Sequence, residues 1–388
     1  MSQAALVPKL RFSEFSDDWE EKRFVDITTK ISDGIHSTPN YDEGGTYSFV
    51  NGNNLVNGVI KINSQTKKVD ENEYTTHQRP LGSNTILISI NGTIGNLALY
   101  NNEKVVLGKS ACYLNINEKD TDKLYVFNLL RTCKIKRFFN SELTGSTIKN
   151  LSLTTIKNTK LNLPTKPEQQ KIAAFLTAVD NKIEQLSKKQ ALLGEYKKGL
   201  TQQIFSQAIR FKADDGSDFP DWKEKKLGSL CEITTGKLDA NAMVKDGQYR
   251  FYTCAKEYYK IDDYAFDTDA LIVSGNGANV GYIHHYQGKF NAYQRTYVLD
   301  SFTDNIVFVK FVLDGYLHKR IMKEKNEGNT PYIVMGTLTD MKINLPSFSE
   351  QTKISNFLSS IDSKIEQVSK QLDESKQFKK ALLQQMFV

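Results

Sequence analysis

The sequence predicts an α+β protein with two β-rich domains and two long helices, and three observations support this prediction. Residues 161–206 recur without gaps as residues 343–388, with about half of the positions identical. Both copies space their apolar residues as helices do, whereas the regions before them hold short β-branched and aromatic runs between Asn-Gly, Asp-Gly and Gly-Gly turns. A repeat of nearly half the chain indicates that a whole domain and its connector were duplicated.

The composition indicates a folded protein of more than one domain. The chain has 388 residues, of which 39% are hydrophobic, 11% aromatic and 25% charged, and this length is large for one hydrophobic core. The net charge of +6 suits an anionic partner. The four cysteines have no paired metal or redox spacing, which favours reduced thiols and a cytoplasmic address. No apolar run approaches the ~18 residues of a membrane helix.

Each half is expected to combine short strands with one amphipathic helix. Residues 123–139 and 309–325 place apolar residues three and four apart, which predicts one helix per half. The halves also share landmarks in the same order, so they should share a fold. The matching segments are 15–30 with 219–237, 86–100 with 272–286, 108–114 with 294–300, and 134–147 with 317–330.

The repeated segments predict two long helices that pair with each other. Their apolar steps of four and three are typical of a coiled-coil seam, and roughly 35 residues would give a rod on the order of 50 Å. Antiparallel pairing would relate the halves by a pseudo-twofold axis in a circular arrangement. The first five residues of each seam are expected to bind the partner helix. The seams are Ile172, Leu176, Val179, Ile183, Leu186, Leu193, Leu200 and Ile204, and Ile354, Leu358, Ile361, Ile365, Val368, Leu372, Phe378, Leu382 and Met386.

These patterns divide the chain into four parts. We expect a first domain at 1–163, a central helix at 164–210, a second domain at 211–345 and a C-terminal helix at 346–388. The acidic residues Glu168 and Glu350 fall in or next to the first turn of each helix, where the helix dipole favours them.

The chain resembles the specificity subunits of type I restriction-modification systems over its whole length. The most specific motifs are P-x-x-x-E-Q at 164–169 and 346–351, and I-x-x-F-L-x-x-x-D-x-K-I-E at 172–184 and 354–366. Residues 31–41, 87–96 and 145–153 also resemble phrases of target-recognition domains, although the last is less well kept in the second half.

The resemblance implies a non-catalytic reader of double-stranded DNA with a split target. In the family, two modification subunits methylate adenine, and restriction subunits join the full complex. S-adenosylmethionine, and ATP and Mg²⁺ for restriction, would belong to those partner subunits, with no cofactor, metal or membrane partner for this chain. Because B-DNA repeats every ~34 Å, paired rods could hold two readers about one turn or a little more apart, with the bases between them unread.

Candidate DNA contacts follow from residue type and position. Positive side chains neutralise phosphates, whereas base edges are read by hydrogen bonds, and arginine can bind guanine with two of them. Arg295 is therefore the favoured base reader, and it is matched in the first half with Lys109 as a strand position. Lys136 with Arg137, and Lys319 with Arg320, lie at matching helix positions and would grip phosphates, unless they only form a solvated helix face. The remaining candidates are Lys30, His36, Ser37, Thr38, Asn91, Thr93, Ser110, Thr147, Lys149, Lys237, Asn241, Asn276, Asn279, Thr296, Asn329 and Thr330.

Two other classes of protein make different demands on the sequence. A nuclease, or an adenine methyltransferase carrying its own recognition domains, would need a catalytic domain. Such a domain would show clustered metal-binding acids or an N/D-P-P-F/Y motif resembling the methyltransferase family, and the sequence has neither. A coiled-coil adaptor that binds only protein is the alternative reading, and it would show no salt-dependent binding to duplex DNA. His284 and His285 are adjacent, so on a strand they would point to opposite faces and could not share a metal ion.

Overall fold

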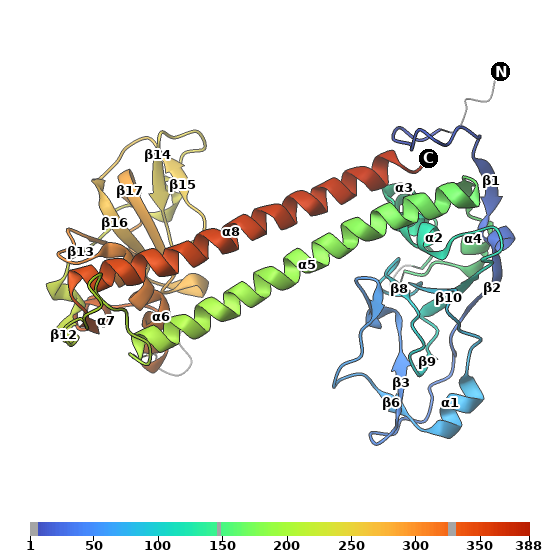
Figure 1. Ribbon diagram of the computed structural model, residues 1–388, viewed down its shortest axis with the longest axis horizontal. Coiled ribbons are helices and arrows are strands. Elements are labelled where there is room, and N and C mark those ends of the chain that lie inside the picture. The colour runs from blue at the N-terminus through green and yellow to red at the C-terminus, as the bar shows by residue number, and fades with distance from the viewer. Residues whose placement is uncertain (1–6, 146–148, 325–330) are drawn as a thin grey trace. The chain divides into compact units, whose positions relative to one another are not determined.

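The computed structural model describes residues 7–145, 149–324 and 331–388. The chain divides into two compact units. Unit 1 comprises Met1–Ser187 with Lys370–Val388, and unit 2 comprises Lys188–Ser369. Each unit therefore holds one β-rich region and a portion of each long helix, α5 (Lys166–Phe205) and α8 (Phe348–Gln385), which are labelled in Figure 1.

Unit 1 is built around an antiparallel four-stranded sheet of order β2-β10-β7-β8. These strands are β2 (Thr28–Asp33), β10 (Ala111–Ile116), β7 (Thr85–Ser89) and β8 (Leu97–Leu99). A second sheet of order β6-β3-β9 joins β6 (Lys68–Val69), β3 (Tyr47–Val50) and β9 (Val105–Leu107). The other elements are β1 (Glu20–Arg23), which pairs with β11 (Lys160–Leu163), the pair β4 (Leu55–Val56) and β5 (Val59–Ile60), and the helices α1 (Glu71–His77), α2 (Lys123–Leu130), α3 (Cys133–Ser141) and α4 (Leu153–Asn158).

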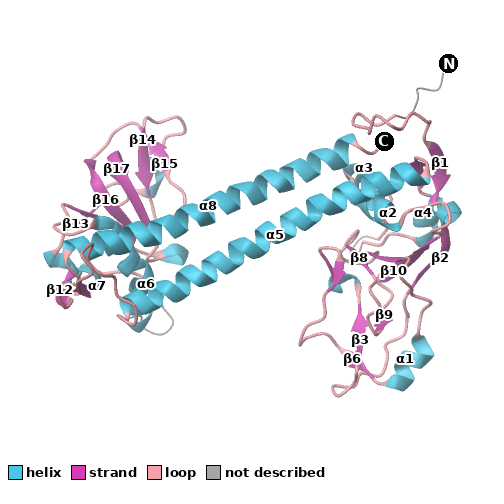
Figure 2. Ribbon diagram, in the orientation of Figure 1, coloured by secondary structure: helices cyan, strands magenta, loops and turns pink. Residues whose placement is uncertain are grey.

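Unit 2 contains a six-stranded sheet of order β13-β18-β16-β17-β14-β15. Figure 2 shows these strands in magenta and the helices in cyan. The strands are β13 (Glu232–Thr235), β18 (Thr296–Asp300), β16 (Phe266–Ser274), β17 (Ile283–Ala292), β14 (Tyr249–Tyr252) and β15 (Tyr259–Ile261). The remaining elements are the pair β12 (Lys223–Lys226) and β19 (Lys342–Leu345), with the helices α6 (Ile306–Glu324) and α7 (Met335–Thr339).

The α+β class and the duplication are confirmed. In both units a strand and a helix of the β-rich region are tied to the start of a long helix by one glutamine. The side-chain oxygen of Gln169 accepts a hydrogen bond from the backbone N–H of Asp122 at 2.8 Å, just before α2. Gln351 does the same for Asn305 at 2.9 Å, just before α6. Each glutamine also donates to the carbonyl of the proline five residues earlier.

The glutamate next to each glutamine is fully buried and paired with an arginine. Arg11 donates two hydrogen bonds to Glu168, at 2.8 and 2.7 Å. Arg210 donates two to Glu350, at 3.3 and 2.8 Å, and the indole of Trp222 adds a third at 3.2 Å. These hydrogen bonds raise the pKa of both arginines. The two glutamates thus lie in the first turn of each long helix and also anchor the chain segment that leads into each β-rich region.

The long helices pair antiparallel within each unit. In unit 1, Ile172 and Leu176 share a core cluster with Leu382 and Met386. In unit 2, Ile204 of α5 shares one with Ile354, Leu358 and Ile361 of α8. As the residue number rises along α5, that of its neighbour on α8 falls. Seven of the ten predicted helix-binding residues are buried and three are half-buried, namely Val179, Ile183 and Ile365.

The predicted seam is wrong at one position of α8. Phe378 is 52% exposed, whereas its neighbour Lys379 is buried at 6%. Counting on from Leu372 by steps of three and four reaches 375, 379 and 382, so the seam passes through the lysine. A pattern of apolar residues alone could not identify a charged seam position.

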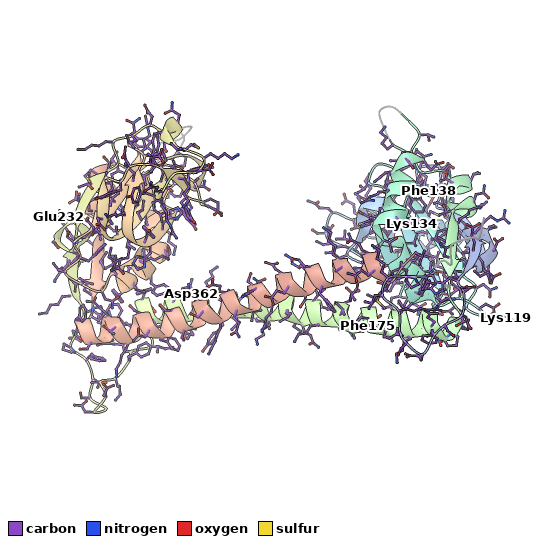
Figure 3. All side chains as sticks on the ribbon, turned by 90° about the horizontal axis from the view of Figure 1, so that it is seen from above. Lys119, Lys134, Phe138, Phe175, Glu232 and Asp362 are labelled. Atoms are coloured by element: carbon purple, nitrogen blue, oxygen red, sulfur yellow. The ribbon has the colours of Figure 1, made fainter. Side chains whose placement is uncertain are left out.

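Lys379 is accommodated because it pairs with Asp180, which also accepts a hydrogen bond from Arg131 at 2.9 Å. The equivalent pair in unit 2 joins Lys197 and Asp362 at 2.6 Å, and Asp362 is labelled on α8 in Figure 3. The two pairs occupy equivalent positions of the repeat. Paired polar groups in a coiled-coil seam fix its register, because a slipped register would leave them unpaired.

The segment that precedes each β-rich region docks in the same way on the end of a long helix, as expected for a circular arrangement. The backbone N–H of Ile209, which follows α5, donates to the carbonyl of Gln203 at 3.2 Å. In unit 1, the N–H of Leu10 donates to Gln385 at 2.9 Å, although Leu10 does not follow α8 in sequence. Leu10 therefore occupies beside α8 the place that Ile209 occupies beside α5.

The prediction of one helix per half holds only for unit 2, where α6 is continuous. In unit 1 the predicted helix is broken into α2 and α3 at Thr132. The hydroxyl of Thr132 caps α3 by accepting from the N–H of Ile135 at 3.4 Å, and it also donates to the carbonyl of Leu129 at 2.7 Å. Unit 2 has Gly315 at this place, which has no side chain to cap a new helix.

We predict that Asp180→Asn destabilises the protein by about 2 kcal/mol, because it leaves the buried ammonium of Lys379 beside Arg131 without a negative charge. Asp362→Asn is the matched control. Its partner Lys197 is 27% exposed, so a loss below about 1 kcal/mol is expected. Calorimetric unfolding of both variants measures the difference, and equal losses would contradict the prediction.

The deficit of Asp180→Asn should also depend on pH. Burial lowers the pKa of Lys379 from 10.5 to about 8, so the folded state holds this proton less tightly than the unfolded chain. Stability therefore rises as pH increases between these two values. The free energy of unfolding that Asp180→Asn loses should therefore be smaller near pH 10.5 than at neutral pH.

Candidate nucleic-acid interface

Several loops of unit 1 meet at one end of its four-stranded sheet, where β2 and β7 end and β10 begins. The N–H of Ile35 donates to the carbonyl of Leu107 at 2.7 Å, and that of Ile90 donates to Ser110 at 2.9 Å. The N–H of Leu151 in turn donates to Ile90 at 2.8 Å. These bonds bring together four loops that are far apart in the sequence, which we call the unit 1 loop cluster (residues 34–38, 90–96, 108–110 and 149–151).

Glycine at 34 is required for this arrangement. A Cβ at Gly34 would lie 2.0 Å from the carbonyl oxygen of Leu107, far inside van der Waals contact. The same holds in unit 2, where a Cβ at Gly236 would lie 2.0 Å from the carbonyl of Ala292. In both units the loop after the first sheet strand thus packs directly against backbone.

The structure places most of the unit 1 candidates in the loop cluster. His36, Ser37 and Thr38 are exposed, and the ring of His36 contacts Asp33 at 2.9 Å. Thr93 and Lys109 are exposed, and Lys149 is brought beside Asn91 by a backbone bridge between Asn91 and Asn150. Lys30 is exposed on β2, three residues before that strand ends, and Thr147 lies outside the described residues.

Unit 2 repeats the same backbone frame. The N–H of Gly275 donates to the carbonyl of Arg295 at 2.9 Å, and that of Ile333 donates to Gly275 at 2.7 Å. The N–H of Gly236 donates to Thr296 at 3.1 Å. The resulting unit 2 loop cluster comprises residues 236–241, 275–281, 293–295 and 331–333.

These backbone hydrogen bonds show that the predicted match between Arg295 and Lys109 is wrong. By its hydrogen bond to Gly275, Arg295 corresponds to Ser110, which bonds to Ile90, and not to Lys109. Arg295 also lies in the turn before β18 and not on the strand, as Lys109 lies in the turn before β10. The sequence match was wrong by one residue because the two turns share no residue that would reveal their register.

The unit 2 candidates differ in exposure. Arg295, Lys237 and Asn241 are exposed, whereas Thr296 is fully buried and cannot reach a ligand in this conformation. Asn279 uses its side-chain amide to hold the carbonyl of Cys254 at 3.1 Å. Asn276 is half-buried in a bridge with Tyr332, and Asn329 and Thr330 lie outside the described residues.

Comparison with known proteins decides the family. The profile described as "Type I restriction modification DNA specificity domain" matches residues 16–193 and again residues 220–375, which together are most of the chain. The chain belongs to the type I restriction-modification specificity-subunit family. Members of this family are non-catalytic subunits, so the chain is not itself an enzyme.

Named relatives cover the chain to different extents. The EcoDI specificity subunit of Escherichia coli is 43% identical over 168 residues, which are 42% of this chain and 37% of that protein. The chain therefore matches little more than a third of the EcoDI subunit. The MjaVIII specificity subunit of Methanocaldococcus jannaschii is 25% identical over 405 aligned residues, covering 95% of this chain and 91% of that protein.

Solved structures share the fold. The S subunit of a type I restriction-modification system from M. genitalium matches with a TM-score of 0.67 and 19% identity over 99% of both chains. A chain from a study of complex assembly in the type I R-M system matches with a TM-score of 0.52 and 16% identity, covering 94% of this chain and 96% of that one.

The basic helix pairs of this specificity subunit are not equivalent. Lys136 and Arg137 are exposed on α3, the helix that carries the labelled Lys134 and Phe138 in Figure 3. In unit 2, Lys319 is exposed, whereas Arg320 donates to the carbonyl of Asp340 at 3.0 Å and pairs with Glu324 at 2.9 Å. Arg320 therefore holds α6 and α7 together, and only the other three are free to meet a phosphate.

Sequence reasoning missed an aromatic and cationic group in unit 2. The guanidinium of Arg250 lies 4.3 Å from the ring of Tyr258 and 4.2 Å from that of Tyr286. A hydrogen bond to Tyr252 raises the pKa of Arg250, so it stays charged. Arg250 lies on β14, Tyr286 on β17 and Tyr258 just before β15, so only the pairing of β14 with both neighbouring strands brings them together, and their spacing in the sequence carries no signal of its own.

The histidines and cysteines indicate no metal site. His284 contacts the carbonyl of Ala255 at 3.0 Å and burial lowers its pKa, while His285 contacts Asp269 at 2.8 Å on the other face, as predicted. Burial raises the pKa of Cys231 to about 12. Within residues 7–145, 149–324 and 331–388, no three His, Cys, Asp or Glu side chains gather as metal ligands would. None of the described helices is long and apolar enough to cross a bilayer.

We predict that Gly34→Ala disrupts the unit 1 loop cluster and costs about 2 kcal/mol or more, because the new methyl group must push Leu107 away. Gly44→Ala is the matched control, since the nearest atom to its Cβ would be 3.5 Å away, and a change within about 0.5 kcal/mol is expected. Thermal unfolding distinguishes the two, and a neutral Gly34→Ala would show that the loop packs differently.

Proposed function

We propose that this chain is the DNA-reading subunit of a type I restriction-modification complex. Each unit reads one half of a split target in double-stranded DNA and directs adenine N6 methylation, and restriction, by partner subunits. The observation that carries the proposal is that both units build one backbone frame and display different side chains on it.

The displayed residues support reading of two unlike half-sites. Where unit 1 exposes His36, Ser37 and Thr38 after its packed glycine, unit 2 exposes Lys237 and Asn241. At matching turn positions, unit 2 exposes Arg295, whereas unit 1 has the half-buried Ser110, whose hydroxyl is bonded to Asn51 and Gly52. Side chains that form hydrogen bonds with base edges carry specificity, so a shared frame with unlike side chains suits one protein that reads two different sequences.

Repeated surface residues on the two long helices favour the binding of two copies of one partner. Seven exposed positions are identical in both copies of the repeat, although packing does not require them to be, and four of these lie close together on each helix. They are Lys182, Glu184, Gln185 and Lys188 on α5, and Lys364, Glu366, Gln367 and Lys370 on α8. We propose that these repeated surface residues bind two identical modification subunits. Those subunits would supply S-adenosylmethionine, with ATP and Mg²⁺ used by restriction subunits, in the cytoplasm.

Mapping of methylated adenines tests the proposed function. The chain is co-expressed with its modification subunit, and methylated sites are read by long-read sequencing. A split motif with an unread gap is expected, and binding of the complex to duplex DNA should weaken steeply as salt is added. An unmethylated genome together with salt-independent behaviour would instead favour the protein-binding adaptor.

We predict that Arg295→Ala relaxes one base position in one half-site, at a cost of roughly 1 to 3 kcal/mol in discrimination, because an arginine can bind guanine with two hydrogen bonds. The control is Lys136→Ala with Arg137→Ala, which should weaken binding to all sequences alike. Methylation maps of both variants measure the two effects. Unchanged selectivity of Arg295→Ala would exclude it as a base reader.

We predict that exchanging the charges of Glu184 and Lys188, as Glu184→Lys with Lys188→Glu, lowers the bound modification subunits from two to one. The exchange keeps opposite charges four residues apart on the helix, so the helix itself should lose only about 0.5 kcal/mol or less. The control exchanges the exposed but unrepeated residues, as Lys189→Glu with Glu195→Lys. Light scattering of the purified complexes gives the stoichiometry, and two bound subunits in both variants would contradict the prediction.

A further inference from the structure

We infer that unit 1 carries a second base-reading site, in a hollow beside its loop cluster, and that Asn53 and Gln65 each read an adenine there. The inference rests on the proposed function and adds to it a location and a base. The hollow has a volume of about 310 Å³ and lies between residues 49–54 and 61–67. Sequence reasoning assigned nothing to this segment.

The lining of the hollow suits nucleic acid. It consists of amides, lysines, a threonine and one aromatic ring, with no carboxylate among the described residues that form it. Lys61 and Lys67 are exposed at its edge, and the ammonium of Lys67 lies 4.1 Å from the ring of Tyr41. A concave surface with positive charge and no negative charge can approach DNA phosphates without repulsion.

Two of its amides shape the hollow and are not available to a ligand in full. The side chain of Asn54 accepts from the N–H of Asn51 at 3.0 Å and donates to the carbonyl of Lys61 at 3.1 Å. Asn63 accepts from the N–H of Gln65 at 3.0 Å. The bonds between Asn54 and Lys61 join the two sides of the hollow, and the bond of Asn63 fixes the turn on one side, so the site is formed before any ligand binds.

Asn53 and Gln65 are the amides left for recognition. Both are exposed, and within the described part of the chain neither side chain has a hydrogen-bond partner. A primary amide can donate to N7 and accept from the N6 amino group of adenine at the same time, which no other base allows at its major-groove edge. Adenine is therefore the base that each of these two residues would select, and each would need an adenine of its own because one edge pairs with only one amide in this way.

The hollow is fixed to the loop cluster by direct contacts. The hydroxyl of Ser110 donates to the side-chain oxygen of Asn51 at 2.9 Å and accepts from the N–H of Gly52 at 2.9 Å. The approach requires glycine at 108, because a Cβ there would lie 2.3 Å from the same oxygen of Asn51. A duplex that meets the loop cluster would therefore meet the hollow beside it.

Unit 2 has different chemistry at the equivalent place. In both units this segment follows a strand that pairs in parallel, β3 with β9 and β14 with β17. After β14 come tyrosines, with Tyr258 against the guanidinium of Arg250, in place of the amides of unit 1. The segments that follow β3 and β14 therefore differ in chemistry, as expected for units that read unlike half-sites.

The test is the methylation map of Asn53→Ala and of Gln65→Ala, each co-expressed with the modification subunit. At one adenine position of one half-site, discrimination should fall by roughly 5- to 150-fold, which corresponds to the loss of one paired amide contact. The other half-site should be read as before, and this also shows that the variant is folded. Asn101→Ala is the matched control, because Asn101 is an exposed amide after β8, at the opposite end of the sheet.

Each other outcome overturns the inference in a distinguishable way. A split target that both variants read unchanged removes the second site and leaves the proposed function standing. Relaxation at guanine or cytosine, or an equal loss at both half-sites, excludes adenine reading by these amides. If the wild-type chain directs no methylation, the proposed function fails and the inference fails with it.

Discussion

The buried pair of acid and amide at the start of each long helix is the contact on which the rest of the structure depends. Glu168 and Glu350 are fully excluded from solvent, and each is matched by a bidentate arginine from the segment that enters its domain. Breaking one partner of a buried ion pair costs about 3 to 5 kcal/mol, because the remaining charge cannot be hydrated. The adjacent glutamines fasten the same turn to the helix of the β-rich region. One turn of helix thus fixes the entry segment, the helix start and the domain relative to one another.

This contact explains which parts of the sequence were kept after duplication. The repeated residues that hold the frame are the acid, the amide, most of the seam and the aspartate–lysine pairs. The loop clusters keep their backbone hydrogen bonds and the packed glycines Gly34 and Gly236, while their exposed side chains diverge. Backbone contacts do not depend on side-chain identity, so the displayed residues could change without loss of the fold.

The sequence predicted the features that apolar residues mark and failed where a charged residue or a turn determines the structure. The two long helices and their antiparallel pairing followed from the repeat, because most apolar seam positions were seen twice. Phe378 was assigned to the seam because a charged residue such as Lys379 gives no apolar signal, and only its partner Asp180 makes burial tolerable. Arg295 was misaligned by one residue because turn register depends on backbone bonds that sequence does not display. The amides near Asn53 were missed because asparagines in loops are usually turn residues, as Asn54 and Asn63 are here.

In the circular arrangement, the position of a segment depends more on its docking contacts than on its order along the chain. Leu10 reaches its place beside α8 through a backbone hydrogen bond to Gln385, where Ile209 reaches the equivalent place beside α5 by chain connection and the same bond to Gln203. Arg11 and Arg210 then complete equivalent ion pairs from these equivalent positions. The covalent link between α5 and the second domain therefore adds little geometry that the docking contacts do not already impose. In each unit, these contacts set the frame that carries the loop cluster. One pattern of buried residues can therefore support two different sets of exposed ones.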